Sequence, residues 1–376
     1  MSNTNLSNNN IFESFSFGKT TLRNRIVMAP MTRNQSPNGI PTAQVAAYYR
    51  SRAEGGVGLI ISEGTYIGHS GANGYANVPA FHGESALAGW KKVIDAVHAA
   101  GGKMIPQIWH VGAARTLGVE PDPAVPGFGP MQIESDGVVQ VKSMTQLDIN
   151  EAVAAYAQAA ADAERLGFDG VEIHGAHGYL IDQFLWQGSN QRTDAYGGSL
   201  VNRLRFALEV VSAVRAKVSA NFPVIFRFSQ WKLGDYEAKI AQSPEELAAI
   251  VKPLADAGVD YFHASTRRLW QPAFDGSNEN LAAWTRQLSG KPVIAVGSVG
   301  LEKEFRTGHF TREESPDAKV QVNIEQLQQG IVNQQFDLVA VGRALLSDPQ
   351  WPNKVQAGRL QDLVHFDVTA LDNLVT

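Results

Sequence analysis

The sequence predicts an α/β protein whose 376 residues form one closed (β/α)8 barrel, the TIM barrel architecture. Short runs rich in β-branched residues recur eight times, and amphipathic, Ala-rich segments separate them, which is typical of parallel strands covered by helices. The first run leads into Pro30-Met31-Thr32, with no G-x-G-x-x-G turn. An open doubly wound sheet also alternates strands with helices, but the strand count and the missing turn favour the barrel.

Each element is predicted from its own residues. Phe15 and Phe17 alternate in segment 12–22, which predicts a hairpin that closes the bottom of the barrel. Short apolar runs predict the eight strands at 25–30, 57–64, 103–109, 170–174, 223–229, 261–265, 292–297 and 338–343. Amphipathic periodicity predicts helices at 83–100, 148–166, 200–218, 244–257 and 324–333. The Pro- and Gly-rich segment 112–143 follows the third strand, and we expect a long loop that caps the top of the barrel.

Composition and charge narrow the possible chemistry. The chain has no cysteine, which excludes disulfides, cysteine-bound zinc or iron–sulfur clusters and thiolate nucleophiles. Its net charge of −5 is evenly distributed, so nucleic acid and anionic membranes are poor candidate partners. The polar segment 1–10 predicts a disordered tail rather than a signal peptide, and no apolar run is long enough to span a bilayer. We expect a cytoplasmic protein with a single domain at 11–376.

Polar residues at strand ends carry the chemistry of a barrel. The strand at 170–174 ends in His174-Gly175-Ala176-His177-Gly178-Tyr179, where two glycines let the backbone bring two imidazoles and a phenol together. Such a trio can donate hydrogen bonds and a proton. The two histidines could instead be metal ligands in a metal-dependent hydrolase or lyase, or a purely structural pair. The other strand ends are rich in arginine and poor in carboxylates, which favours an anion over a metal ion as the ligand. These strand-end residues are Thr32, Gly64, Gln107, Arg227, Ser265, Ser298 and Arg343.

Two groups of strand-end residues suit the two halves of a mononucleotide. Arg227 lies among large apolar neighbours, and its burial requires an anion, several acceptors or a structural ion pair. Together with Gln107 and Thr32 it could satisfy a flat heterocycle that bears carbonyls and ring nitrogens. The last two strands end in Gly297-Ser298 and Gly342-Arg343, where barrels characteristically bind a phosphate. A flat ring joined to a phosphate suggests FMN.

At this point the motifs resemble those of the Old Yellow Enzyme family of FMN-dependent barrel oxidoreductases. The resemblance covers nearly the whole chain in five ordered blocks: NRIVMAPMTR at 24–33, QIW at 107–109, HGAHGYL at 174–180, QRTDAYGGS at 191–199 and VGR at 341–343. In having Thr32 and no cysteine, the chain resembles the single-domain, threonine-bearing members of that family. Members commonly follow the arginine of the fifth strand with Leu-Ser-Pro, whereas this chain has Phe228-Ser229-Gln230-Trp231.

The resemblance implies FMN as a non-covalent cofactor. It implies that Arg227 stabilises the anionic reduced flavin, while Gln107 holds the pyrimidine edge. The cofactor would be bound by Pro30, Met31, Thr32, Gly64, Gln107, His174, Arg227, Gly297, Ser298, Gly342 and Arg343.

The resemblance also implies a reaction. NADPH or NADH would reduce FMN, and His174 and His177 would then bind the oxygen of an α,β-unsaturated carbonyl compound or nitroalkene. Hydride would pass from flavin N5 to the β-carbon while Tyr179 protonates the α-carbon, in a ping-pong cycle with net trans addition. Nitrate esters and nitroaromatics are further possible substrates.

The walls of the pocket are expected to come from tryptophans and loops. Trp109 would line the substrate pocket, although a core position is the alternative. The loop at 266–280, with Trp270, is the candidate for substrate selection, and a surface loop with a packed tryptophan is the alternative. The loop at 228–236 departs from the family, and the charged segment 302–319 is expected to form a mobile cap or loop. The oligomeric state is not readable from the sequence.

Overall fold

The structure is a computed structural model that describes residues 11–301 and 324–376. The predicted tail at 1–10 and the predicted cap at 302–319 therefore lie outside the described residues. In the described part of the chain, no helix is both long and apolar enough to cross a membrane.

Eight strands close into a parallel barrel in the order β10-β11-β12-β13-β3-β4-β5-β9. Each neighbouring pair is parallel. The strands are β3 (Ile26–Met28), β4 (Leu59–Tyr66), β5 (Met104–Trp109), β9 (Val171–His174), β10 (Val224–Ser229), β11 (Tyr261–Ser265), β12 (Val293–Val296) and β13 (Leu338–Val341). All eight predicted strands are therefore confirmed. Their β-branched residues are buried, either inside the barrel or against the outer helices.

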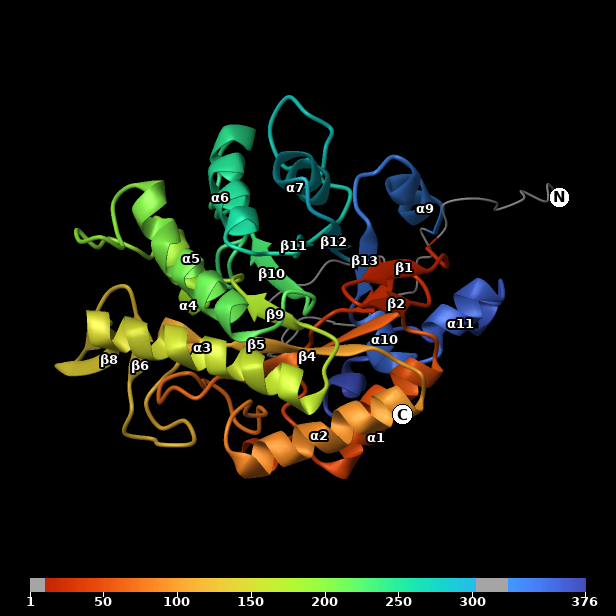
Figure 1. Cartoon of the computed structure of the whole chain (residues 1–376), viewed down its shortest axis with the longest axis horizontal. Coiled ribbons are helices and arrows are strands. Elements are labelled where there is room, and N and C mark those ends of the chain that lie inside the picture. The colour runs from red at the N-terminus through yellow and green to blue at the C-terminus, as the bar shows by residue number, and fades with distance from the viewer. Residues whose placement is uncertain (1–10, 302–323) are drawn as a thin grey trace.

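Helices surround the barrel (Figure 1). Those predicted from periodicity are α2 (Glu84–Ala99), α3 (Gln146–Leu166), α5 (Leu200–Lys217), α6 (Pro244–Asp256) and α9 (Ile324–Val332). The structure adds α1 (Ala43–Glu54), α4 (Leu180–Leu185), α7 (Leu281–Ser289), α10 (Ala344–Ser347) and α11 (Trp351–Gln356), with 3-10 turns at Pro37–Gly39, Gly112–Ala114, Leu360–Asp362 and Val368–Leu371. Local capping sets several boundaries: Thr145 and Asp148 form a capping box at the start of α3, and Gly167, with φ of 92°, ends it.

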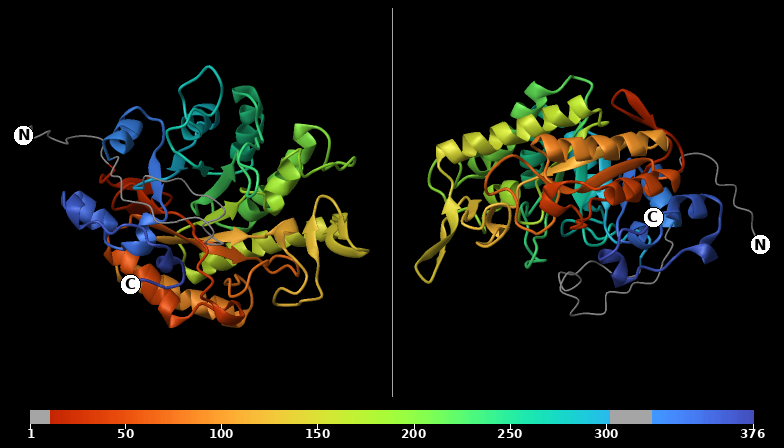
Figure 2. Two further views of the ribbon diagram at one scale, coloured as in Figure 1. Left: turned by 180° about the vertical axis from the view of Figure 1, so that it is seen from behind. Right: turned by 90° about the horizontal axis from the view of Figure 1, so that it is seen from below.

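A hairpin of β1 (Phe15–Phe17) and β2 (Thr20–Leu22) seals the end of the barrel at which the strands begin, as predicted. Phe17 and Leu22 are fully buried in a cluster with interior residues of the barrel strands, such as Ile225. The hairpin lies at the upper edge of the right-hand view of Figure 2. Because this end is sealed by apolar side chains, a ligand cavity belongs at the other end.

The insertion after β5 differs from the predicted loop, because it contains a three-stranded sheet of β6 (Gly127–Gly129), β7 (Ile133–Ser135) and β8 (Val138–Ser143). Asp136 and Gly137 connect β7 to β8, and both have positive φ, as in a type I′ hairpin turn. The buried guanidinium of Arg115 donates to five backbone carbonyls, among them those of Asn73 and Val125, and so orders the start of the insertion. The sheet projects from the side of the barrel, at the left of Figure 1.

Candidate active site

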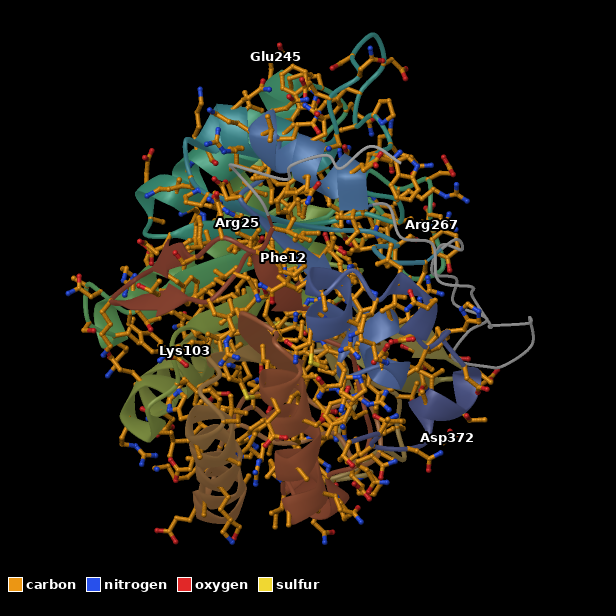
Figure 3. The ribbon with its side chains drawn as sticks, turned by 90° about the vertical axis from the view of Figure 1, so that its right-hand side faces the viewer. Phe12, Arg25, Lys103, Glu245, Arg267 and Asp372 are labelled. Atoms are coloured by element: carbon orange, nitrogen blue, oxygen red, sulfur yellow. The ribbon has the colours of Figure 1, made fainter. Side chains whose placement is uncertain are left out.

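A cavity of about 210 Å³ opens where the eight barrel strands end. Figure 3 shows the two ends of the barrel: Lys103, which precedes β5, lies on one side of the molecule, and Arg267, which follows β11, lies on the other. Each barrel strand, or the residues directly after it, contributes to the lining. The lining consists of Ala29, Pro30, Met31, Thr32, Gly64, Gln107, Trp109, His174, His177, Tyr179, Arg227, Trp231, Leu233, Ser265, Thr266, Arg267, Val296, Gly297, Ser298, Val299, Leu301, Gly342, Arg343, Leu346, Phe366 and Leu371.

The structure brings all the predicted site residues into this lining except Trp270. Trp270 is 40% exposed, so the pocket role expected for it has no support in its position. The backbone N–H of Leu269 donates to the carbonyl of Gly297 at 3.2 Å, and the Leu269 side chain is buried, which turns the next residue toward solvent. Arg267, from the same loop, reaches the cavity instead.

The end of β9 brings two imidazoles and a phenol together in the cavity. The ring centroid of His174 lies 5.4 Å from that of His177 and 5.1 Å from that of Tyr179. His177 adopts the left-handed backbone conformation, with φ of 64°, and Gly178 follows with φ of 82°, so the chain turns back on itself here. This turn places three polar side chains of one short segment on the same wall.

Burial determines the charge of the two imidazoles. It lowers the pKa of both His174 and His177 well below the ordinary value, and the positive charge of Arg227 lowers both further. Both rings are therefore neutral near pH 7. The Nδ1 atom of His174 accepts a hydrogen bond from the N–H of Ala176 at 3.3 Å, which assigns the ring proton to Nε2 as a donor. The Nε2 atom of His177 is held 2.8 Å from the Ser265 hydroxyl.

Tyr179 is held as a protonated phenol. Burial, followed by the neighbouring Tyr75, raises its pKa well above the ordinary value. The two phenol oxygens lie 3.1 Å apart, and Tyr75 in turn stacks on Trp109 at 5.7 Å. Tyr179 can therefore give up a proton only to a group that becomes strongly basic during a reaction. Trp109 serves both roles considered from the sequence, because it is buried in the core and also lines the cavity.

The floor of the cavity carries a positive charge. Burial lowers the pKa of Arg227 to about 10, so the guanidinium stays charged at neutral pH. Among the described residues its hydrogen-bond partner is the Ser265 hydroxyl at 3.4 Å, and its Nε atom is buried without a partner. An unpaired donor of this kind is costly to bury, and a ligand carbonyl or anion would satisfy it.

The ends of β12 and β13 form a corner suited to a phosphate. Protein packing requires glycine at position 297, because a Cβ there would lie 2.5 Å from Thr266 Oγ1. At Gly342 the nearest atom to a Cβ would be Met31 Sδ at 3.6 Å, so the space beside this glycine is open to a ligand. Burial lowers the pKa of Arg343 to about 10, which leaves its guanidinium charged beside that space.

Two parts of the cavity wall were not assigned from the sequence. Trp231 stacks on His177, with ring centroids 4.4 Å apart, in the loop at 228–236, where the chain departs from the pattern that it otherwise resembles. Phe366 and Leu371 come from the C-terminal segment, which the buried Arg33 holds by donating to the backbone carbonyls of Leu371 and its neighbours. The unusual tryptophan in the sequence could have indicated the role of Trp231. No periodicity in the sequence indicates that the C-terminal segment reaches the cavity.

The geometry favours an organic ligand over a metal ion bound by His174 and His177. Within residues 11–301 and 324–376, no three or more His, Asp or Glu side chains gather in a way that could hold a metal ion. The ring planes of His174 and His177 meet at 83°, and His177 Nε2 is occupied by the Ser265 hydroxyl. Two neutral donors, a charged guanidinium and a phenol are better suited to an organic ligand with oxygen atoms.

Comparison with known proteins gives consistent matches. The model of the NADH:flavin oxidoreductase / NADH oxidase family matches residues 10–315. The NADH oxidase of Thermoanaerobacter brockii is 33% identical over 94% of this chain, which spans only 52% of that longer protein. The 12-oxophytodienoate reductase 2 of Arabidopsis thaliana is 34% identical over 91% of this chain and 87% of its own length.

Solved structures are similar along almost the whole chain. Morphinone reductase in complex with tetrahydroNAD has a TM-score of 0.78 and 29% identity, covering 97% of this chain and 94% of that one. The old yellow enzyme homologue from Zymomonas mobilis has the same TM-score and 25% identity, with 97% and 96% covered.

Proposed function

The chain belongs to the NADH:flavin oxidoreductase / NADH oxidase family, as its likeness to Old Yellow Enzyme indicated, and we propose that it is an FMN-dependent NAD(P)H oxidoreductase that reduces activated carbon–carbon double bonds. One observation carries the proposal. A single cavity combines a charged, incompletely bonded guanidinium in its floor with two neutral imidazoles and a protonated phenol in its wall. The guanidinium in the floor would stabilise a ring that gains negative charge, and the hydrogen-bond donors in the wall would stabilise a substrate oxygen that gains negative charge.

The residues fit FMN at both ends of the cavity. Arg227 and Gln107 would meet the carbonyl oxygens and ring nitrogens of the flavin, and Arg343 with the open space at Gly342 would receive its phosphate. Pro30, Met31, Thr32 and Gly64 would line the ring. When bound, FMN supplies a group that takes up a hydride from NADPH or NADH and releases it to an organic acceptor.

The wall residues would act on the acceptor. His174 through Nε2, and His177 through Nδ1, would donate hydrogen bonds to the oxygen of an α,β-unsaturated carbonyl or nitro compound, where negative charge develops as hydride reaches the β-carbon. Because both rings are neutral and buried, this donation requires no change of protonation state. Tyr179 would donate its proton to the α-carbon, which completes the reduction.

The nucleotide and the acceptor would use the same cavity in turn, so we expect ping-pong kinetics. The guanidinium, the two imidazoles and the phenol on which the proposal rests all line this one cavity.

Purified protein distinguishes this proposal from the alternatives. We expect a yellow protein with one FMN per chain whose visible absorption is bleached by NADPH or NADH without oxygen. Colourless, active protein with stoichiometric zinc would instead establish a metal-dependent hydrolase or lyase that uses His174 and His177. Bound FMN that neither nucleotide can reduce would indicate a flavin-binding protein without this activity.

A further inference from the structure

A layer of buried polar side chains lies directly beneath the cavity. The Nε2 atom of Gln107 donates to Glu172 Oε1 at 2.7 Å, and the other carboxylate oxygen of Glu172 lies 2.7 Å from His263 Nδ1. Glu172 and His263 are completely inaccessible to solvent, and neither lines the cavity. Of these two buried titratable groups, Glu172 is hydrogen-bonded to Gln107 in the cavity floor and acts electrostatically on Arg227, and the proposed reaction gives neither group a part.

The barrel register brings these side chains together. Gln107 is paired with Glu172 across β5 and β9, and Arg227 is paired with His263 across β10 and β11. Since side chains two residues apart on a strand point the same way, the layer below consists of apolar residues such as Ile225. The polar layer therefore separates an apolar core from the cavity.

Glu172 determines how the amide of Gln107 is turned. A carboxylate with two donors against it can only accept, so the amide nitrogen of Gln107 must face it. The amide oxygen of Gln107 accepts no hydrogen bond from a described residue and is left for the cavity, which Gln107 lines. Rotation of the amide would place its oxygen against a buried carboxylate, which is strongly unfavourable.

Glu172 also offsets the charge of the floor. It provides the electrostatic attraction that opposes the effect of burial on Arg227, although the two side chains form no ion pair within 4 Å. His263 adds no positive charge, because burial lowers its pKa below the ordinary value. The negative charge of Glu172 thus stands close to the positive charge that would face the flavin.

We propose that Glu172 is a positioning residue that turns the Gln107 carbonyl toward bound flavin and, by offsetting Arg227, sets the reduction potential of that flavin. The proposal rests on the proposed function, because it requires FMN in the cavity. Glu172 touches neither the cofactor site nor the substrate site and acts only through Gln107 and Arg227.

The test is the variant E172Q, measured by FMN binding to the apoprotein and by the midpoint potential of bound FMN at pH 8. Loss of the buried negative charge should favour the anionic reduced flavin. We expect the preference for reduced over oxidised FMN to rise at least tenfold, a positive shift of about 30 mV for a two-electron couple. We also expect oxidised FMN to bind more weakly, because the Gln107 amide becomes free to rotate.

The matched control is E63Q. Glu63 is a buried carboxylate on β4, beside Gly64 of the cavity, and it accepts a hydrogen bond from the Arg33 N–H at 2.8 Å. Burial raises its pKa to about 7, so at pH 8 it is mostly ionised, as a charge control requires. Because Glu63 faces Arg33, whereas the carboxylate that acts on Arg227 is Glu172, we expect E63Q to raise the preference by less than E172Q does. An E172Q preference within twofold of the wild type would overturn the proposal.

A second variant covers the case in which E172Q does not fold. E172D keeps the charge but withdraws the carboxylate from Gln107, so oxidised FMN should bind at least fivefold more weakly while the potential stays near that of the wild type. Unchanged binding by E172D would overturn the positioning role. Wild-type protein that binds no FMN would overturn the proposed function. Wild-type protein that binds FMN, together with an E172D variant that binds it equally well, would overturn only the role of Glu172.

Discussion

The buried ion pair of Lys232 and Asp182 is expected to hold the cavity wall that carries His177 and Tyr179 in place. Lys232 Nζ donates to Asp182 Oδ1 at 2.9 Å and to the backbone carbonyls of Ser229 and Gln230. Asp182 Oδ2 accepts the N–H of Gly178 at 2.6 Å, directly before Tyr179. Only 3% of the lysine side chain and none of the aspartate side chain is exposed. The pair thus ties the turn after β9 to the loop after β10.

The substitution K232M removes the ammonium group but keeps a side chain of similar volume. Breaking a buried pair by removing one partner costs about 3–5 kcal/mol, because the other charge is left uncompensated. With an unfolding entropy of about 2.1 cal/mol/K per residue over 376 residues, this cost corresponds to a fall in melting temperature of roughly 4–6 °C.

The loss should depend on pH. Burial raises the pKa of Asp182, and Lys232 opposes this effect, so K232M raises that pKa further. A carboxyl group that holds its proton more tightly in the folded state makes the free energy of unfolding fall as the pH rises above its unfolded pKa. The deficit of K232M should therefore be larger at pH 7.5 than at pH 5.

Melting curves at both pH values, with FMN saturating, measure the effect. The double variant D182N/K232M buries no charge and keeps an acceptor for the Gly178 N–H, so it should regain most of the lost stability. The control K91M breaks a pair with Asp95 in which both side chains are about half exposed, and it should shift melting by less than about 1 °C. Equal melting of K232M and wild type, or an equal loss in K91M, would refute the reasoning.

Three further substitutions test the cavity. Y179F should slow reoxidation of the reduced protein by an enone about 100-fold or more while reduction by NADPH changes less than threefold, and equal slowing of both half-reactions would exclude proton donation. G342V should weaken FMN binding at least tenfold without lowering apoprotein stability, since the nearest atoms to an added Cβ, in Met31 and Ala29, are 3.6 and 3.9 Å away; unchanged affinity would show that the phosphate binds elsewhere. W231A should weaken the binding of a phenol to the oxidised protein roughly 2–12-fold, because His177 loses a stacking partner worth about 0.5–1.5 kcal/mol, and a spectral titration with unchanged affinity would contradict this.

Local patterns predicted most of the fold. The eight barrel strands and the hairpin at 15–22 followed from β-branched runs and alternating aromatics, because these patterns depend on neighbours along the chain. The small sheet in the insertion was missed, although Asp136-Gly137 between two short apolar runs is a hairpin signal. The Pro- and Gly-rich surroundings favoured a loop over that signal.

Local sequence patterns predicted only part of the candidate site. The strand-end residues converge because a closed barrel brings all its strand ends to one face, and this held for residues as distant in sequence as Thr32 and Arg343. The C-terminal wall could not be predicted, because the backbone of the segment that provides Leu371 is held by Arg33, more than three hundred positions earlier in the sequence. The position of Trp270 outside the cavity lining could not be predicted, because a loop tryptophan has no periodicity that indicates which way it faces.

The most direct test of the central claim is a single anaerobic turnover. The protein is reduced with one equivalent of NADPH, an activated enone is added, and the flavin absorption and the product are followed together. We predict that the oxidised flavin spectrum returns and that one saturated product forms per FMN. A flavin that stays reduced in the presence of enones and nitroalkenes would contradict the proposed activity.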